Sequence, residues 1–177
     1  MGREEMKSLK FHLISLAVII SILAGCAGSQ LVTQKPIEIK LASFSTLYFM
    51  AEPNVAEDVT KEITQLEERV ISKLKKKDLF KNVELGNVAD SSAGTLQVKA
   101  TISEIKKVSN TQRFFGGAFA GKASMLVEVA FIDVAAGKTI GSYSIQGKSG
   151  GTGVSGGTGE AIWKTGDAIV ELISNNY

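Results

Sequence analysis

The strongest folding signal in this sequence is a long apolar stripe between residues 54 and 80. Aliphatic residues recur there at three- and four-residue steps, namely Val55, Val59, Ile63, Leu66, Val70 and Leu74. That spacing places them on one face of an amphipathic helix. Asn54 and Glu57 have the spacing of a capping box at the start of this helix. A helix with a single apolar face needs a second layer of structure to cover that face.

The predicted helix ends in a basic run, Lys75, Lys76 and Lys77. Two interpretations of this run are open. The lysines complement the dipole at the carboxyl end of the helix, or they contact an anionic lipid or a phosphate.

Alternating apolar residues predict the sheet that covers the helix. In the segment 95–108, Leu96, Val98, Ala100 and Ile102 alternate with polar residues, and the segments 122–134 and 139–147 continue the pattern. Asp133 and Gly137 predict a hairpin turn between the last two segments. We therefore expect three antiparallel strands in a row. A short edge segment at 37–41, a buried strand at 47–50 and a short strand at 80–85 complete the predicted strands.

A second helix is predicted at the carboxyl end, with Ile162, Gly166, Ile169 and Ile173 on one face. A glycine in a helix interior costs about 1 kcal/mol relative to alanine, so Gly166 indicates close approach to a neighbouring element. The sequence thus predicts an α+β two-layer sandwich: a mainly antiparallel sheet with the long helix and the C-terminal helix on one face.

The amino terminus has the pattern of a secretory signal peptide. Lys7 and Lys10 precede an apolar run from Phe11 to Leu23, and small residues follow. The run ends in Leu23-Ala24-Gly25-Cys26, which resembles the lipobox of bacterial lipoproteins. That resemblance implies diacylglycerol on the Cys26 thiol, cleavage just before Cys26, and acylation of the new amino terminus with a fatty acid such as palmitate. The alternative is an unmodified, buried cysteine beside a spanning helix.

The lipobox also implies how the chain is divided. Residues 1–25 are a cleaved signal peptide that starts at Met1 or Met6, residues 26–36 a lipidated tether, and residues 37–177 a single α+β periplasmic domain. Ala27 is not the aspartate that retains many lipoproteins in the inner membrane, so the resemblance implies the periplasmic face of the outer membrane.

The composition of the mature chain excludes several kinds of chemistry. The one histidine, His12, lies in the signal peptide, and the one cysteine is Cys26. Catalysis by Ser-His-Asp or Cys-His groups is therefore excluded, as is a zinc or copper site with histidine or cysteine ligands, and we expect no cofactor. With 20 basic and 18 acidic residues, the charge is too balanced to indicate nucleic-acid binding.

Two arrangements of the remaining polar residues resemble catalytic pairs. Ser103 and Lys106 match an S-x-x-K motif, but on a predicted strand they point to opposite faces unless a bulge intervenes. Glu128 and Asp133 supply two carboxylates, which are also predicted on opposite faces of one strand. A carboxylate hydrolase is therefore the weakest of the functional hypotheses.

A third motif resembles a phosphate-binding loop. Gly116 to Lys122 read G-x-x-x-x-G-K, but Ala123 stands where the motif needs serine or threonine. The following residues are predicted to form a strand, whereas a phosphate loop opens a helix. We expect no nucleotide binding.

Two glycine-rich segments have open roles. The first carries Phe114, Phe115 and Phe119 between two predicted strands, and these rings form either an exposed interaction tip or part of the core. The glycine-rich loops from Gly116 to Gly121 and from Gly150 to Gly159 form either an anion-binding nest or plain connectors. If these loops form a nest, the chain is a periplasmic binding module for a small ligand, a glycan or a lipid.

The sequence resembles the bacterial lipoprotein family that contains the domain of unknown function 4410, over most of the mature chain, roughly from Phe44 to the end. The resemblance lies in the lipobox at Cys26, the block RFFGGAFAGKASMLVEVAFIDVAAGKTIGSYSIQG and the segment GGTGVSGGTGEAIWK. It implies no activity and no catalytic residue. The leading hypothesis is a non-catalytic, lipid-anchored envelope protein that acts at the outer membrane through contacts with other proteins.

Overall fold

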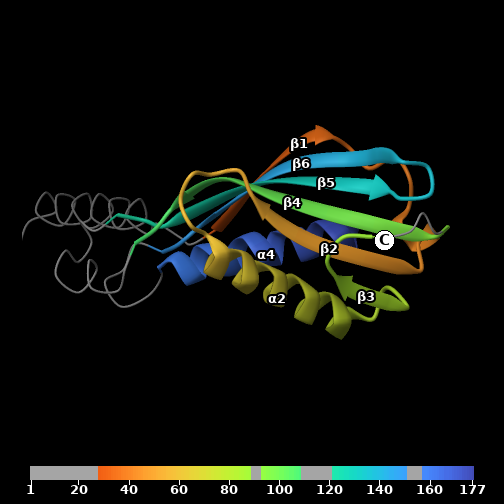
Figure 1. Ribbon diagram of the computed structural model, residues 1–177, viewed down its shortest axis with the longest axis horizontal. Helices are drawn as coiled ribbons and strands as arrows, with labels where there is room; N and C mark the ends of the chain where they lie inside the picture. Colours follow the sequence, from red (N-terminus) through yellow and green to blue (C-terminus); the bar gives the residue numbers. More distant parts are fainter. Residues whose placement is uncertain (1–27, 89–92, 109–120, 151–156) are drawn as a thin grey trace, which may run out of the picture.

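A six-stranded sheet with two helices against one of its faces forms the fold (Figure 1). The computed structural model describes residues 28–88, 93–108, 121–150 and 157–177. The elements follow in the order β1 (Gly28–Lys35), η1 (Leu41–Ser43), β2 (Thr46–Pro53), α2 (Thr60–Lys77), β3 (Asn82–Leu85), β4 (Thr95–Lys106), β5 (Ser124–Asp133), β6 (Lys138–Lys148) and α4 (Thr158–Asn175). The predicted α+β sandwich, with both helices on one face, is confirmed.

The sheet is mixed, with strand order β1-β6-β5-β4-β2-β3. The pairs β1–β6, β6–β5 and β5–β4 are antiparallel, which confirms the predicted row of three antiparallel strands. Strand β2 is parallel to both β4 and β3. The parallel β2–β3 pair arises because α2 carries the chain back across the sheet between them, as parallel neighbours require.

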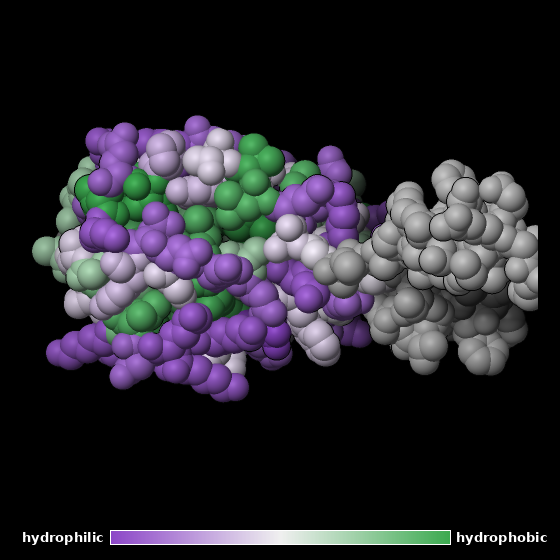
Figure 2. Space-filling view, turned by 180° about the vertical axis from the view of Figure 1, so that it is seen from behind, coloured by the Kyte–Doolittle hydropathy of each residue, from purple (hydrophilic) through white to green (hydrophobic). Residues whose placement is uncertain are grey.

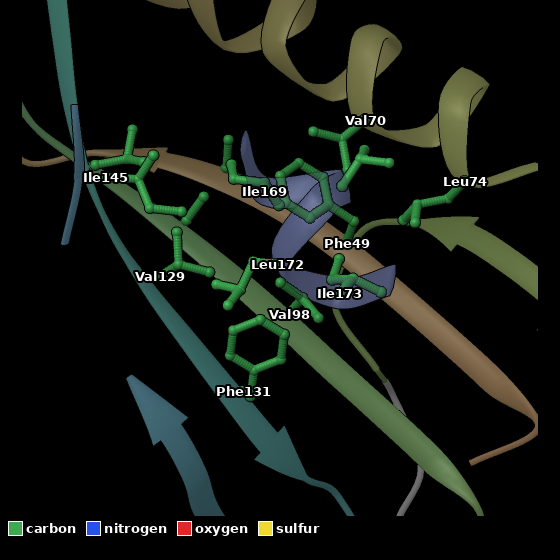
Figure 3. Packing of buried hydrophobic residues seen from close by; sticks show 14 of the residues in the cluster. Phe49, Val70, Leu74, Val98, Val129, Phe131, Ile145, Ile169, Leu172 and Ile173 are labelled. Atoms are coloured by element: carbon green, nitrogen blue, oxygen red, sulfur yellow. The ribbon is translucent and has the colours of Figure 1, made fainter. Parts of the chain in front are cut away.

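The core lies between the sheet and the two helices. Alternate residues of the central strands, such as Val98, Val129 and Ile145, are fully or almost fully buried on the helix side. The stripe of α2 and the predicted face of α4 cover them, and Figure 3 shows Val70 and Ile169 directed toward the sheet. The apolar residues that alternate along the strands and those that recur along the helices therefore form one buried layer.

Helix α2 begins later than predicted. The capping-box prediction was wrong, because the Asn54 amide donates to the Ile102 carbonyl (2.9 Å) and thereby continues the contact of β2 with β4. The helix begins at Thr60 instead, where the Asp58 carboxylate accepts bonds from the Thr60 amide (3.0 Å) and hydroxyl (2.7 Å). These hydrogen bonds lower the pKa of Asp58.

The segment predicted as a tether contains a strand, so that prediction was wrong for Gly28–Lys35. This segment is β1, which pairs along the free edge of β6, and the domain therefore begins before residue 37. Most side chains of β1 are exposed, so no alternation of apolar and polar residues marks it in the sequence. The edge strand predicted at 37–41 is also wrong, because residues 36–40 form no strand and Leu41 begins η1.

The turn between β5 and β6 has the predicted chemistry. The Asp133 carboxylate accepts a bond from the Ala136 amide (3.1 Å), and Gly137 has a φ of 59°. Glycine adopts this left-handed conformation without steric cost. Asp133 therefore has a structural role in the hairpin.

Candidate interaction surface

The predicted lipidation site and the predicted aromatic tip lie outside the described residues. These are Cys26, Phe114, Phe115 and Phe119. Most of the two glycine-rich segments, residues 116–120 and 151–156, lies there too. Lipidation, the interaction tip and the glycine nest therefore stay predictions.

The strand that follows the phosphate-loop motif is confirmed. Gly121 and Lys122 lead into β5, which begins at Ser124. A phosphate loop needs the amino terminus of a helix at this point, where backbone amides face the phosphates. The motif therefore lacks the structural context of a nucleotide site.

Ser103 and Lys106 do not form a catalytic pair. The β4–β5 register shifts between Ile102 and Glu104, so Ser103 occupies a bulge. Its hydroxyl donates to the Leu126 carbonyl at 3.3 Å, and no described contact joins it to Lys106. The serine is thus held by the sheet backbone.

The two carboxylates of β5 are also separate. Glu128 accepts a bond from the Gln34 side chain (2.7 Å), whereas Asp133 holds the hairpin turn. Five residues of strand place them about 16 Å apart. Among the described residues, no three histidine, cysteine, aspartate or glutamate side chains gather as a metal site would require.

Several polar side chains on the helix-free face of the sheet pair with one another. Lys99 forms an ion pair with Glu52 (2.9 Å), and Thr101 donates to the same carboxylate (3.2 Å). Figure 2 shows one face of the whole molecule, on which separate apolar patches lie between polar side chains.

Helices α2 and α4 approach closely at Gly166. A Cβ atom at this position would lie 2.9 Å from Cγ of Arg69, so the predicted close approach is confirmed. Without a side chain on Gly166, Arg69 of α2 reaches across α4. There it lies between Trp163 and Asp167, which are one helical turn apart on α4.

Arg69 connects an exposed aromatic ring to a carboxylate. Its guanidinium carbon lies 5.6 Å from the centre of the Trp163 ring, within range of a cation–π interaction. Its Nε and one terminal nitrogen donate to the two Asp167 oxygens at 2.8 and 2.9 Å, and Lys73 pairs with the same carboxylate at 2.9 Å. This network fixes the orientation of Arg69 against the tryptophan.

The charges of the network support one another. Partial burial raises the pKa of Asp167, but the hydrogen bonds and charges of Arg69 and Lys73 outweigh this effect, so the pKa is lowered overall. The hydrogen bond with Asp167 in turn raises the pKa of Arg69. Both groups are therefore charged at neutral pH. The pairs are partly exposed, and each contributes about 1 kcal/mol or less to stability.

Trp163 makes this surface a candidate for binding. It is 54% exposed, although it is the largest side chain in the protein. Beside it is a hollow of about 500 Å³ lined by Gln65, Glu68, Arg69, Ser72, Lys73, Lys76 and Trp163. Tryptophan and arginine are the residues most enriched at binding hot spots. We call Trp163, Arg69, Lys73 and Asp167 the Trp163 surface.

The Trp163 surface was not predicted from the sequence. A usable signal was present, because Trp163 directly follows Ile162 of the apolar face and therefore lies off that face. The partners were not predictable, since Arg69 is 98 residues from Asp167 and nothing in either helix indicates their pairing.

The chain matches one family model over most of the described domain. The family model described as "Domain of unknown function (DUF4410)" matches residues 34–153, which is more than half of the chain. The chain belongs to this family. The match covers β2 to β6 and ends before α4, so the Trp163 ring of this family member lies outside the matched region. No curated protein matches the chain.

Solved structures share the fold at low sequence identity. PelC from Paraburkholderia phytofirmans, solved as a dodecamer, is 12% identical with a TM-score of 0.55, over 82% of this chain and 96% of PelC. The Xanthomonas campestris protein XCC0632, of the DUF330 family, is 9% identical with a TM-score of 0.44, over 83% and 91% of the two chains. The PelC match shows a common fold, and the second is too distant to support an argument.

Proposed function

We propose that this family member is a non-catalytic, lipid-anchored envelope protein that acts through contacts with other proteins. The observation that carries the proposal is the Trp163 surface, where an exposed tryptophan is held by Arg69 beside a hollow. Neither described helix combines the length and apolar character that a membrane-spanning helix needs. The anchor in this proposal is lipid on Cys26, and the location is the periplasmic face of the outer membrane.

PelC adds support for a role in assembly. That protein was solved as a dodecamer, so its fold supports a large assembly in at least one case. In this proposal the Trp163 surface contacts a protein of an envelope assembly, and a further copy of this chain is one such protein.

Lipidation of Cys26 is tested by mass spectrometry of the mature protein. We expect a single amino-terminal peptide that begins at Cys26 and carries diacylglycerol and a further acyl chain. Replacement of Cys26 by serine should leave the signal peptide uncleaved and remove the lipid. An unmodified Cys26 in the mature wild-type protein would refute the anchor.

Contacts through the Trp163 surface are tested by substitution of Trp163 with alanine, followed by in-cell cross-linking and co-purification. Truncation of a hot-spot residue costs about 2 kcal/mol or more, so we expect binding of the cross-linked protein to weaken about thirtyfold. Leu85→Ala is the matched control, because Leu85 is 56% exposed on β3 but lies away from α4.

Folding of both variants is first checked by circular dichroism. Equal capture by wild type, Trp163→Ala and Leu85→Ala would contradict a role of this surface in binding.

A further inference from the structure

The chain enters the sheet at the same end at which α4 begins. Gly28, the first described residue, pairs with Lys148 at the end of β6, and Lys148 pairs with Ser124 at the start of β5. The Val108 amide just beyond β4 donates to the Thr158 hydroxyl at the start of α4 (3.1 Å). Cys26 precedes Gly28 by two residues, which span at most about 7 Å. An anchor on Cys26 therefore holds this end of the domain at the membrane.

Three lysines gather at this end of the sheet, and two of them, Lys106 and Lys148, lie on its helix-free side. Lys106, Ser124 and Lys148 form one row across β4, β5 and β6, with the serine in the middle. The two lysines are thus about 10 Å apart. A Cβ atom on Gly121 would lie 3.5 Å from the Lys106 ammonium, so that ammonium lies beside Gly121, the chain neighbour of the exposed Lys122. We call Lys106, Lys122, Lys148 and Ser124 the lysine patch.

The charge of the lysine patch is not neutralised within the described structure. None of its three lysines has a carboxylate within 4 Å among the described residues, and Lys148 contacts only the uncharged Gln30 amide (3.1 Å). The neighbouring Lys107 differs, because Glu62 (3.2 Å) and Glu57 (3.6 Å) both pair with it.

The lysine patch also offers a neutral donor and little competing charge. The Ser124 side chain has no hydrogen-bond partner among the described residues, so its hydroxyl is available to a bound anion. Glu104, which lies opposite Leu126 in the β4–β5 register, is the carboxylate of the next row of the sheet. The three lysines of the patch outnumber this one negative charge. The patch is therefore suited to a phosphate group.

We propose that the lysine patch binds the phosphates of anionic lipid headgroups in the membrane that carries the anchor. This inference rests on the proposed lipidation of Cys26. The attraction between the lysines and the phosphates adds to the membrane affinity that the anchor supplies. It also fixes the tilt of the domain, since the patch lies on one face of the sheet. The β5–β6 turn then points away from the bilayer, about 30 Å from Ser124 along β5.

The basic run at the end of α2 supplies a matched control. Glu62 in the first turn of α2 contacts Lys107, and Lys75 lies about 20 Å further along the helix axis. Lys75, Lys76 and Lys77 are exposed and carry the same charge as the patch, but they lie at the opposite end of the molecule.

The test measures which end of the lipidated, full mature protein lies at the headgroups. A cysteine at Gly159, where a Cβ meets nothing within 4 Å, or at the exposed Ala135 of the β5–β6 turn, carries a fluorophore. Lipid on Cys26 leaves the new thiol as the only reactive one. The protein is placed in phosphatidylcholine vesicles with or without phosphatidylglycerol, each containing a headgroup-labelled quencher lipid.

We expect quenching at Gly159 to exceed that at Ala135 at least about twofold when phosphatidylglycerol is present, because the two ends are about 30 Å apart. A lysine near an anionic surface contributes about fivefold to the ratio of docked to undocked protein. Joint Lys106→Gln, Lys122→Gln and Lys148→Gln substitution should abolish the effect of phosphatidylglycerol. Joint Lys75→Gln, Lys76→Gln and Lys77→Gln substitution should preserve it.

Three results would refute headgroup binding by the lysine patch without refuting the lipid anchor. They are equal quenching at both ends, an effect that does not depend on phosphatidylglycerol, and loss of the effect in the α2 control variant. Loss caused by inorganic phosphate, but not by chloride of equal ionic strength, would assign the patch to a free anion instead. Failure of the wild-type protein to float with vesicles would refute the anchor, and the inference with it.

Discussion

Replacement of Gly147 by alanine should destabilise the fold by about 3 kcal/mol, the largest effect we expect from a single methyl group. The added Cβ would lie 2.3 Å from the Ala161 carbonyl oxygen and 2.7 Å from the Thr165 amide nitrogen. Both are backbone atoms of α4, so no side chain can move aside to make room. Helix α4 would have to shift away from β6. Urea denaturation of the purified protein measures the loss.

Gly159→Ala is the control for this substitution. It lies in the first turn of the same helix, and its Cβ would meet nothing within 4 Å. Alanine favours helix over glycine by about 1 kcal/mol, so this variant should be as stable as wild type or slightly more stable. Equal stability of Gly147→Ala and Gly159→Ala would show that α4 does not pack directly against β6 at Gly147.

Replacement of Phe49 by alanine should cost about 3–5 kcal/mol, because it leaves a cavity in the centre of the core. Phe49 is fully buried on β2, and Figure 3 shows its ring between Val70 of α2 and Ile169 of α4. The ring therefore joins both helices to the sheet. The expected loss is a large share of the stability of an ordinary domain.

Leu85→Ala tests whether the loss comes from burial. Leu85 pairs with Phe49 across the β2–β3 ladder but is 56% exposed, so its truncation should change stability by about 0.5 kcal/mol or less. Thermal unfolding of both variants beside wild type separates these outcomes. A loss of about 1 kcal/mol or less in Phe49→Ala would mean that the three elements do not share this core.

The sequence predicted elements best where burial and periodicity coincide. The stripe of α2 and the alternation along β4, β5 and β6 are direct consequences of one buried face, and all of these elements were predicted. The parallel placement of β2 and β3 was not predicted, because burial on one face does not depend on strand direction. Strand β1 was missed for the opposite reason, since exposed side chains leave only backbone hydrogen bonds to hold it.

The interaction surface was less predictable than the fold. Lipidation of Cys26 follows from a local motif, so it was predicted from sequence and stays a prediction. The Trp163 surface and the lysine patch both bring together residues that are far apart in the chain, such as Arg69 with Asp167 and Lys106 with Lys148. Neither grouping can be found until strand register and helix packing are known.

The position of β1 determines how a mechanical load would cross the protein. The strand begins at the end of the sheet nearest Cys26 and runs antiparallel to β6, with partners from Gly28 to Lys35. A pull on Gly28 along the sheet acts parallel to the strands and at right angles to the inter-strand hydrogen bonds. All the bonds of the β1–β6 ladder then share the force together instead of opening one after another. An edge strand that contributes few side chains to the core is thus placed to transmit tension between the amino terminus and the domain.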